Sequence, residues 1–244
     1  TREMQQKVLD SKVVGDEDIR RINSAPQRSQ EWHAAREGRL TGSRAGTAIG
    51  KNPYESQDDL MRSMLGFTKF AGNAATRNGT KMEPFAAASF LRIMRARYGA
   101  GCQLGIPGLI VCKAHPYIAY SADGVVILED GTRALIEIKA PFRKKVYPMT
   151  PPMYFAQMQL GMFVLNLSAC YFVVYCGSGG HTDDSNTHIE VIPRDNKYIN
   201  ETLLPGLNKF YFKRFLPMYI CLKHNMLKNG QVYLPCGVRV EYLK

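Results

Sequence analysis

The sequence predicts an α/β fold in which helices flank a central mixed β-sheet. Helical patterns occupy much of the chain before residue 98, strand patterns follow between 109 and 140, and helix and strand then alternate up to residue 192. This succession is typical of a layered α/β core. A hydrophobic fraction of 45% in a chain of 244 residues is sufficient to fill such a core.

The formal net charge of +11 favours an acidic partner, and nucleic acid is the common partner of a globular domain with this charge. Binding to a membrane surface would call for a basic amphipathic helix, which the sequence does not show. No apolar run reaches membrane-spanning length, and the first residues lack the pattern of a signal peptide. We therefore expect a nucleic-acid partner and no membrane.

The six cysteines form no C-x-x-C pair, which argues against a zinc ribbon. Several of them lie within apolar runs and have the setting of buried free thiols. Free thiols indicate an intracellular, reducing compartment. The cysteines are Cys102, Cys112, Cys170, Cys176, Cys221 and Cys236.

The strongest pattern in the chain lies between Ser121 and Arg143. Two apolar runs, 125–128 and 134–140, flank the turn signal at 129–131, so we expect a β-hairpin. The second strand contains two charged residues, which is unusual for a strand that is otherwise apolar.

Glu137 and Lys139 are two positions apart on that strand, so their side chains point to the face that Leu135 also occupies. Buried charges are costly unless they are paired or bind a metal, and Asp123 could add a second carboxylate at the same place. Two carboxylates suit Mg²⁺, and a lysine could orient the water that attacks a phosphate ester. The alternative is a surface Glu–Lys pair of little energetic value, because this spacing also arises by chance.

The first part of the chain divides into two regions. Residues 1–28 are mostly polar and predict an N-terminal arm or weakly attached extension. Residues 29–244 are expected to form a single domain that ends in a tail of helices and strands. Within that domain, Ser29 is a good N-cap for a short helix that stops before Gly38.

A second short helix is expected at 44–49, with Thr41 to Ser43 as its cap. Free N–H groups and hydroxyls at its start could bind a phosphate, and Arg36 and Arg39 could add charge. The alternative is a pair of ordinary capped helices with solvated arginines.

The remaining elements follow from periodicity and from the turn residues that flank each run. Thr80 to Glu83 fits a capping box, whereas Pro84 favours a helix start near Glu83, so the boundary there stays open. Pro205 and Pro217 are expected to interrupt the last helical region. Further helices are predicted over 56–65, 74–98, 154–165 and 197–226, and strands over 109–112, 170–176, 187–192 and within 232–243.

Gln157 lies among the apolar residues of the predicted helix at 154–165. A buried glutamine needs hydrogen-bond partners. A site that contains Lys139, a water molecule and carboxylates would supply them.

Taken in order, four segments resemble the YqaJ-type viral recombinases, the group that contains phage lambda exonuclease, within the PD-(D/E)XK nuclease superfamily. The resemblance covers roughly residues 30 to 195. Ala122 stands where the superfamily often has proline, but S-x-D-G is the normal form in this branch. The four segments are EWHAAR with LTGS at 31–43, GTKME at 79–83, SADG with LIEIKAP at 121–141, and YFAQMQ at 154–159.

The resemblance implies a restriction-endonuclease-like core and a metal site. Asp123, Glu137 and the carbonyl of Ile138 would ligate a pair of Mg²⁺ ions. Mn²⁺ could substitute for Mg²⁺. Glu83 would reach the metal directly or through water. Lys139 would position the attacking water.

The resemblance further implies that Gln157 holds the lysine or the water, and that Arg36 and Ser43 bind a 5′-phosphate. The implied activity is digestion of linear double-stranded DNA from the 5′ end, which leaves a 3′ single strand for recombination. A single-strand annealing protein is the implied partner, and some relatives form a ring-shaped homotrimer. A viral chain of this kind would act in the cytoplasm or nucleus of its host.

Two alternatives remain open from the sequence. One is a structure- or sequence-specific endonuclease on the same fold. The other is a non-catalytic DNA-binding scaffold for recombination. An iron–sulfur nuclease is disfavoured, because the cysteine spacing does not fit a cluster.

Overall fold

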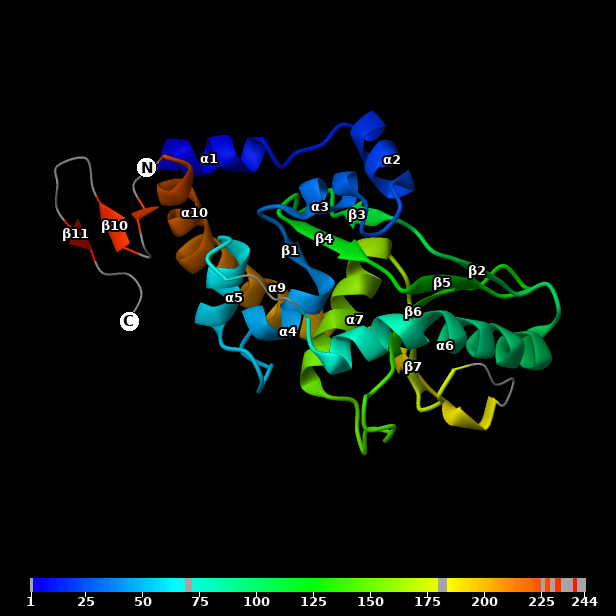
Figure 1. The fold of residues 1–244 in the computed structure, drawn as a ribbon. Coiled ribbons are helices and arrows are strands. Elements are labelled where there is room, and N and C mark those ends of the chain that lie inside the picture. Colours follow the sequence, from blue (N-terminus) through cyan, green and yellow to red (C-terminus); the bar gives the residue numbers. More distant parts are fainter. Residues whose placement is uncertain are drawn as a thin grey trace.

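The computed structural model describes residues 2–68, 72–179 and 184–224, together with the backbone of the short strands at 227–228, 231–233 and 239–240. A five-stranded sheet with the order β2-β5-β6-β7-β8 lies at its centre (Figure 1). β6 and β7 run parallel and the other neighbouring strands are antiparallel, which confirms the expected mixed sheet. The strands are β2 (Gln103–Gly105), β5 (Gly124–Ile127), β6 (Arg133–Lys139), β7 (Ala169–Tyr175) and β8 (Thr187–Pro193).

The predicted hairpin is confirmed as β5 and β6, paired with Gly124 opposite Ile136 and Ile127 opposite Arg133. Its turn contains Gly131 at φ 84°, a conformation that glycine adopts without steric cost. β2 adds a short edge strand in a segment for which no strand was predicted.

A second, three-stranded sheet lies beside the first, in the order β1 (Leu40–Thr41), β4 (Ile118–Ser121) and β3 (Leu109–Val111). β4 leads directly into β5, so the chain passes from one sheet to the other at Ala122 and Asp123. Thr41 takes the predicted N-cap position, but before a 3₁₀ turn, and its side chain forms no capping hydrogen bond. It is a fully buried residue of β1 instead. A 3₁₀ turn, Gly42–Arg44, follows it and leads into α4 (Ala45–Ala48).

Two helices cover opposite faces of the central sheet (Figure 1). α6 (Ala74–Tyr98) packs its apolar face, including Phe90, against the face that carries Ile136 and Ile138. α7 (Pro152–Leu165) packs on the other face, where Leu135 lies. The alternation predicted along β6 is therefore confirmed, and Glu137 points to the α7 side.

α6 is one continuous helix, and it begins earlier than a capping box at Thr80 would require. Asn73 caps it and exchanges hydrogen bonds with Thr76, so this pair forms the capping box. Pro84 lies inside the helix, not in its first turn. The helix begins after Asn73 because this cap satisfies N–H groups of the first turn that would otherwise lack partners.

The C-terminal helical region is continuous from Asn196 to Lys223, contrary to the expected interruptions at Pro205 and Pro217. A π-helical segment precedes each proline. The backbone carbonyl four residues before the proline therefore lies in a wider helical turn. The wider turn accommodates the ring and the missing N–H of the proline. The segments are α8 (Asn196–Tyr198), Ile199–Leu203, α9 (Leu204–Phe210), Tyr211–Phe215 and α10 (Leu216–Lys223).

The N-terminal residues form α1 (Arg2–Asp10) and α2 (Asp16–Ser24), which lie along one edge of the molecule (Figure 1). α1 packs against α10, and α2 packs against β3. The division into an arm at 1–28 and a domain at 29–244 stays a prediction. The arm nevertheless makes specific contacts, because Lys12 donates to the carbonyl of Glu37 at 2.8 Å.

The remaining short elements agree closely with their predicted positions. α3 (Gln30–Arg36) is capped by Ser29, and α5 (Gln57–Met64) by Ser56. At the C-terminus, β10 (Gln231–Tyr233) pairs with β9 (Leu227–Lys228) and β11 (Arg239–Val240), as the expected strand pair within 232–243 requires.

Five cysteines in the described part of the chain are free: Cys102, Cys112, Cys170, Cys176 and Cys221. Cys236 lies outside the described residues. None of the helices there is long and apolar enough to cross a membrane.

Candidate active site

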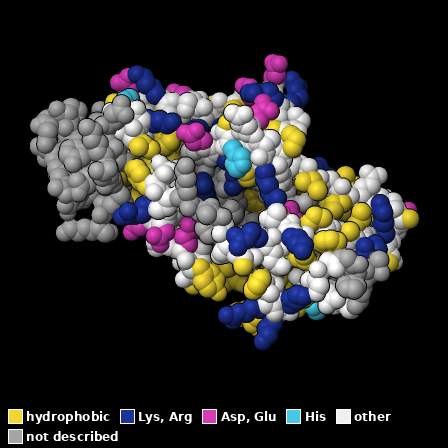
Figure 2. Space-filling view, in the orientation of Figure 1, with side chains coloured by type: hydrophobic (Ala, Val, Ile, Leu, Met, Phe, Trp, Pro, Cys, Tyr) yellow, Lys and Arg dark blue, Asp and Glu magenta, His cyan; other side chains and the backbone are white. Residues whose placement is uncertain are grey.

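A cleft of about 1430 Å³ opens beside the C-terminal end of β6. Lys and Arg side chains surround the hollow in the middle of the face drawn in Figure 2. Residues predicted for the site line this cleft together, although they come from widely separated parts of the sequence. They are Arg36, Ser43, Glu83, Asp123, Glu137, Ile138, Lys139 and Gln157.

Asp123 lies where the chain crosses between the two sheets. Asp123 immediately precedes Gly124, the first paired residue of β5, and its Oδ2 accepts a hydrogen bond of 2.7 Å from the N–H of Ile138. Burial and the nearby charge of Glu137 raise the pKa of Asp123 to about 8. The junction thus places a second carboxylate beside β6, as the hairpin pattern predicted.

Glu137 is completely buried and is held by two donors. Tyr120 donates its hydroxyl to Oε2 at 2.8 Å, and Lys139 forms an ion pair with Oε1. Burial raises the pKa of Tyr120 well above its ordinary value, so this phenol keeps its proton to donate. The sequence alone does not reveal the role of Tyr120, because this hydrogen bond joins β4 of one sheet to β6 of the other.

Two glycines leave the space that Tyr120 needs. A Cβ atom on Gly42 would lie 2.4 Å from the Tyr120 ring, and one on Gly161 would lie 2.5 Å from it. Any larger residue at either position would displace the ring that supports Glu137.

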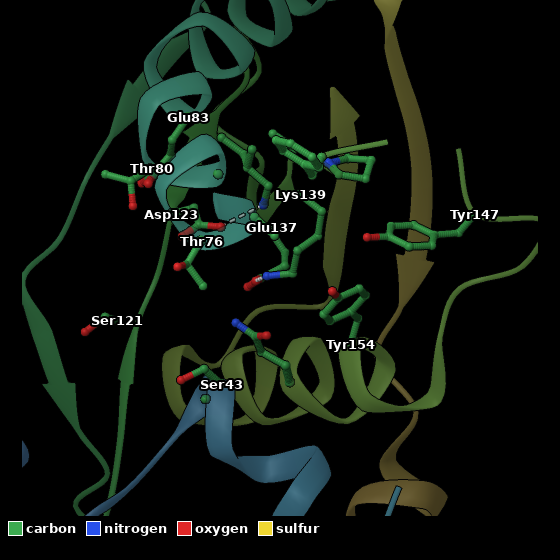
Figure 3. A pocket seen from close by; sticks show the side chains of 18 of the residues that line it. Ser43, Thr76, Thr80, Glu83, Ser121, Asp123, Glu137, Lys139, Tyr147 and Tyr154 are labelled. Carbon is green, nitrogen blue, oxygen red and sulfur yellow. Dashed lines mark hydrogen bonds and ion pairs between the residues drawn. The ribbon is translucent and has the colours of Figure 1, made fainter. Parts of the chain in front are cut away.

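Lys139 joins the carboxylates to a group of aromatic side chains. Its Nζ lies 4.8 Å from the centre of the Tyr154 ring, which itself contacts Tyr147. Burial lowers the pKa of Lys139, but the carboxylates of Glu137 and Asp123 outweigh it and raise the pKa above its ordinary value. The lysine is therefore a permanent cation at the centre of the site (Figure 3).

Asp123, Glu137 and the carbonyl of Ile138 suit a hard divalent cation. The N–H and C=O of one residue in a strand point to the same side. The Ile138 carbonyl therefore faces the side on which its N–H meets Asp123. Carboxylate and carbonyl oxygens are the donors that Mg²⁺ and Mn²⁺ prefer, so this donor set fits the implied metal.

Glu83 points into the same space from α6 (Figure 3). Its carboxylate lies 3.4 Å from the guanidinium of Arg28. Among the residues that the structure describes, no three His, Cys, Asp or Glu side chains are grouped closely enough to hold a metal ion. A role for Glu83 at the metal therefore stays a prediction, and it would act through water in this arrangement.

Gln157 lies on α7, is nearly buried and lines the cleft. Lys139 contacts Glu137 and Tyr154 in this structure, while no hydrogen bond joins Lys139 to Gln157. Its predicted role of holding the lysine or a water stays a prediction.

Arg36 lies at the other side of the cleft, in a group that the sequence only partly revealed. It donates to the hydroxyl of Ser121 at 3.3 Å and to that of Thr41 at 3.2 Å, and its guanidinium lies 4.0 Å from the centre of the Trp32 ring. Trp32 also donates to Ser121 at 2.9 Å. Ser121 is the first residue of the SADG segment that contains Asp123, and this segment is the signal for it in the sequence.

No carboxylate pairs with Arg36 among the described residues, and the exposed Ser43 lines the same part of the cleft. Burial, with a smaller effect from Arg44, lowers the pKa of Arg36 to about 10. It still carries its charge at neutral pH, so this corner suits an anion. Arg39 does not contribute, contrary to expectation, because it is buried and donates to three backbone carbonyls.

The mixed sheet, with Asp123, Glu137 and Lys139 at the end of its central hairpin, defines a PD-(D/E)XK-like nuclease core. The chain belongs to the family described as the YqaJ-like viral recombinase domain, whose model matches residues 31–168.

Solved structures support this assignment. An alkaline exonuclease from Laribacter hongkongensis, LHK-Exo, is 29% identical with a TM-score of 0.62, over 81% of this chain and 97% of that one. The same enzyme in complex with dAMP is 28% identical with a TM-score of 0.61, over 79% of this chain and 94% of that one.

Viral proteins are related as well. A protein of Acanthamoeba polyphaga mimivirus is 25% identical over 170 residues, which is 64% of this chain and 30% of that protein. A protein of African swine fever virus is 25% identical over 202 residues, which is 68% of this chain and 56% of that protein. The chain thus spans only a part of these viral relatives.

Proposed function

We propose that this protein is a metal-dependent exonuclease that digests linear double-stranded DNA from a 5′-phosphorylated end. The observation that carries the proposal is the group formed by Asp123, Glu137 and Lys139 in a basic cleft. Membership of the YqaJ-like family and similarity to an alkaline exonuclease support it. The net charge of +11 suits a DNA substrate.

Asp123, Glu137 and the Ile138 carbonyl would hold Mg²⁺, or Mn²⁺ in its place. When bound, the metal supplies a nucleophilic water at neutral pH and stabilises charge on the phosphate. Lys139 is held by Glu137 and Tyr154, so its ammonium can orient that water or offset the charge that develops. Gln157 would assist from α7, and Glu83 would contact the site through water.

Arg36, Ser43 and Ser121 would bind the 5′-phosphate of the DNA end. A guanidinium without a carboxylate partner forms strong charge-assisted hydrogen bonds with phosphate. Anchoring the 5′ end there would place a phosphodiester bond beside Lys139 and leave a 3′ single strand. The same proposal includes an annealing protein that receives this strand and a ring-shaped homotrimer. It also places the activity in the cytoplasm or nucleus of a host cell.

Degradation of end-labelled linear duplex in Mg²⁺ tests the proposal. Wild-type protein should digest from the 5′ end and prefer a 5′-phosphate over a 5′-hydroxyl. Lys139→Ala should lower the rate on the order of 100-fold or more, since it removes a charge at the reacting group. Arg36→Gln should mainly abolish the preference for the phosphate, while Lys113→Ala, an exposed residue outside the cleft, should act like wild type.

The other outcomes discriminate among the alternatives. Cleavage of closed circular DNA would indicate an endonuclease. Indifference to the 5′ group would refute the anchor at Arg36. Binding without cleavage in Mg²⁺ and Mn²⁺ would favour a recombination scaffold.

A further inference from the structure

Two large aromatic side chains stand exposed at the cleft, and neither ring packs against another ring within the part of the chain that the structure describes. Tyr54 is 85% exposed and Phe142 is 59% exposed, and both line the cleft that contains Lys139. Aromatic rings bury a large apolar area when they find a partner, so a protein gains little from holding them in water. Their placement on one functional cleft indicates a ligand with flat apolar surfaces.

Tyr54 is held in place by an ordered turn. Its N–H donates to Asn52 at 3.0 Å, and Asn52 in turn donates to the hydroxyl of Thr47 at 2.8 Å. Thr47 donates to Glu55 at 2.8 Å. These bonds order the backbone on both sides of Tyr54, so binding through this ring does not have to order the turn as well.

Phe142 is held in a comparable way. It lies in the turn that follows β6, where the N–H of Lys144 donates to the carbonyl of Pro141 at 2.9 Å. Lys144 adopts φ 52° and its ammonium is bonded to Ser178. The turn directs Phe142 outward only three residues after Lys139.

The charges around the two rings identify the ligand. Arg143 and Lys145, which also line the cleft, are exposed basic residues on the same turn as Phe142. A basic surface with exposed aromatic rings is the combination that binds unpaired nucleotides, because bases stack on the rings while phosphates meet the cations. An apolar protein partner would leave Arg143 and Lys145 without counter-charges.

We infer that Tyr54 and Phe142 form a stacking platform for unpaired bases at the end of the DNA, with Arg143 and Lys145 as its phosphate contacts. The inference rests on the proposed function for the identity of the substrate. It adds a subsite for single-stranded nucleotides, so that the protein would recognise frayed or overhanging ends by their bases without reading their sequence.

Binding of a duplex with a short 5′-phosphorylated overhang, measured by fluorescence anisotropy in Ca²⁺, tests this inference. One substrate carries normal bases in the overhang and the other carries abasic sites. Wild-type protein should bind the abasic substrate at least about five-fold more weakly, the effect of one lost base stack. Tyr54→Ala and Phe142→Ala should weaken binding of the normal overhang and leave binding of the abasic one nearly unchanged.

Matched variants separate stacking from general damage. Tyr54→Phe and Phe142→Tyr keep a flat ring and should bind like wild type. Tyr98→Ala removes an aromatic residue that is 40% exposed but lies outside the cleft, and should have no effect. If the alanine variants remain as sensitive to abasic sites as wild type, or if wild type does not distinguish the two overhangs, the platform does not exist.

Cleavage in Mg²⁺, assayed on the same preparations, distinguishes this inference from the proposed function. Digestion of duplex ends without any effect of abasic sites would overturn the platform and leave the exonuclease standing. If binding depends on the rings of Tyr54 and Phe142 but no DNA is cleaved, the platform is supported and the proposed exonuclease activity is overturned.

Discussion

Glu137 shows how a buried charge is kept in position at the scale of a single residue. It is fully buried, and the structure gives each of its oxygens one donor, Tyr120 for Oε2 and Lys139 for Oε1. A carboxylate in this setting is stable only while its partners remain, because an unsatisfied buried charge carries a large desolvation cost.

Tyr120→Phe should therefore reduce both stability and activity. The variant leaves Oε2 of Glu137 without its phenol donor, and we expect a loss of about 1–3 kcal/mol in the free energy of unfolding. Urea denaturation measures this loss, and the rate of duplex digestion should fall in parallel. Tyr54→Phe, which removes a phenol hydroxyl from a side chain that is 85% exposed, provides the control. An unchanged free energy of unfolding would show that water replaces the hydroxyl.

The raised pKa of Asp123 predicts how metal binding depends on pH. A metal binds the deprotonated carboxylate and expels its proton. Since burial and Glu137 raise this pKa to about 8, the apparent affinity for Mg²⁺ should increase with pH up to about 8 and then level off. Calorimetric titration in buffers of different ionisation enthalpy would count the released proton, and Asp123→Asn should release none.

The raised pKa of Asp123 also makes the stability of the metal-free protein depend on pH. Between the ordinary value of 3.8 and about 8, folded Asp123 binds a proton that the unfolded chain has lost. The contribution of Asp123 to the free energy of unfolding therefore decreases as pH rises through this window. A series of denaturation curves should show this slope in the wild type and a smaller one in Asp123→Asn. The absence of a difference would contradict the shift.

At the scale of elements, the site depends on how closely the 3₁₀ turn and α7 approach β4. Gly42 lies in the 3₁₀ turn and Gly161 in α7, and both lie against the ring of Tyr120. The turn also carries Ser43 into the cleft. The contact between Gly42 and Tyr120 thus links the turn of the proposed phosphate anchor to the tyrosine that supports Glu137.

Gly42→Ala should disturb both functions together. Its Cβ would lie 2.4 Å from the ring of Tyr120, so the turn or the ring must move. We expect a loss of about 1–3 kcal/mol in stability and a reduced preference for 5′-phosphate. Gly15→Ala is the matched control, because nothing lies within 4 Å of its Cβ, its φ of −69° suits alanine, and it lies outside the cleft. A Gly42→Ala protein as stable as wild type would show that the ring adapts freely.

At the scale of the whole molecule, the N-terminal arm and the core are connected through Arg39. This buried guanidinium donates to the carbonyls of Ala35, Pro116 and Lys12, and so joins three segments of the chain. Gln27 adds a contact with the carbonyl of Ala122, next to Asp123. The arm thereby reaches the residues that border the cleft.

Deleting residues 1–12 should consequently destabilise the protein. Arg39 would lose one of its three acceptors, and α10 would lose the packing of α1, so we expect a decrease of about 1–3 kcal/mol or more in the free energy of unfolding. Thermal denaturation measures the change. Lys7→Ala, which breaks an ion pair with side chains 74% and 76% exposed, should cost less than about 1 kcal/mol. Equal stability of the truncated and full chains would refute a structural role for the arm.

The sequence by itself determined the features that local patterns encode. The hairpin, the opposite faces of Leu135 and Ile136, and the common face of Glu137 and Lys139 all follow from the period of two along a strand and a glycine turn. The cap at Ser29 follows from the hydrogen bonds that a hydroxyl offers to a helix start.

Only the tertiary structure decided which distant residues meet. Trp32 and Ser121 are 89 positions apart, and Arg36 and Ser121 are 85 apart, yet they form one anion-binding corner. The buried strand position of Thr41 and the continuous helix past Pro205 and Pro217 were likewise missed. The reason is physical: periodicity reports which face of an element is buried, whereas the partner on that face is fixed by packing of the whole chain.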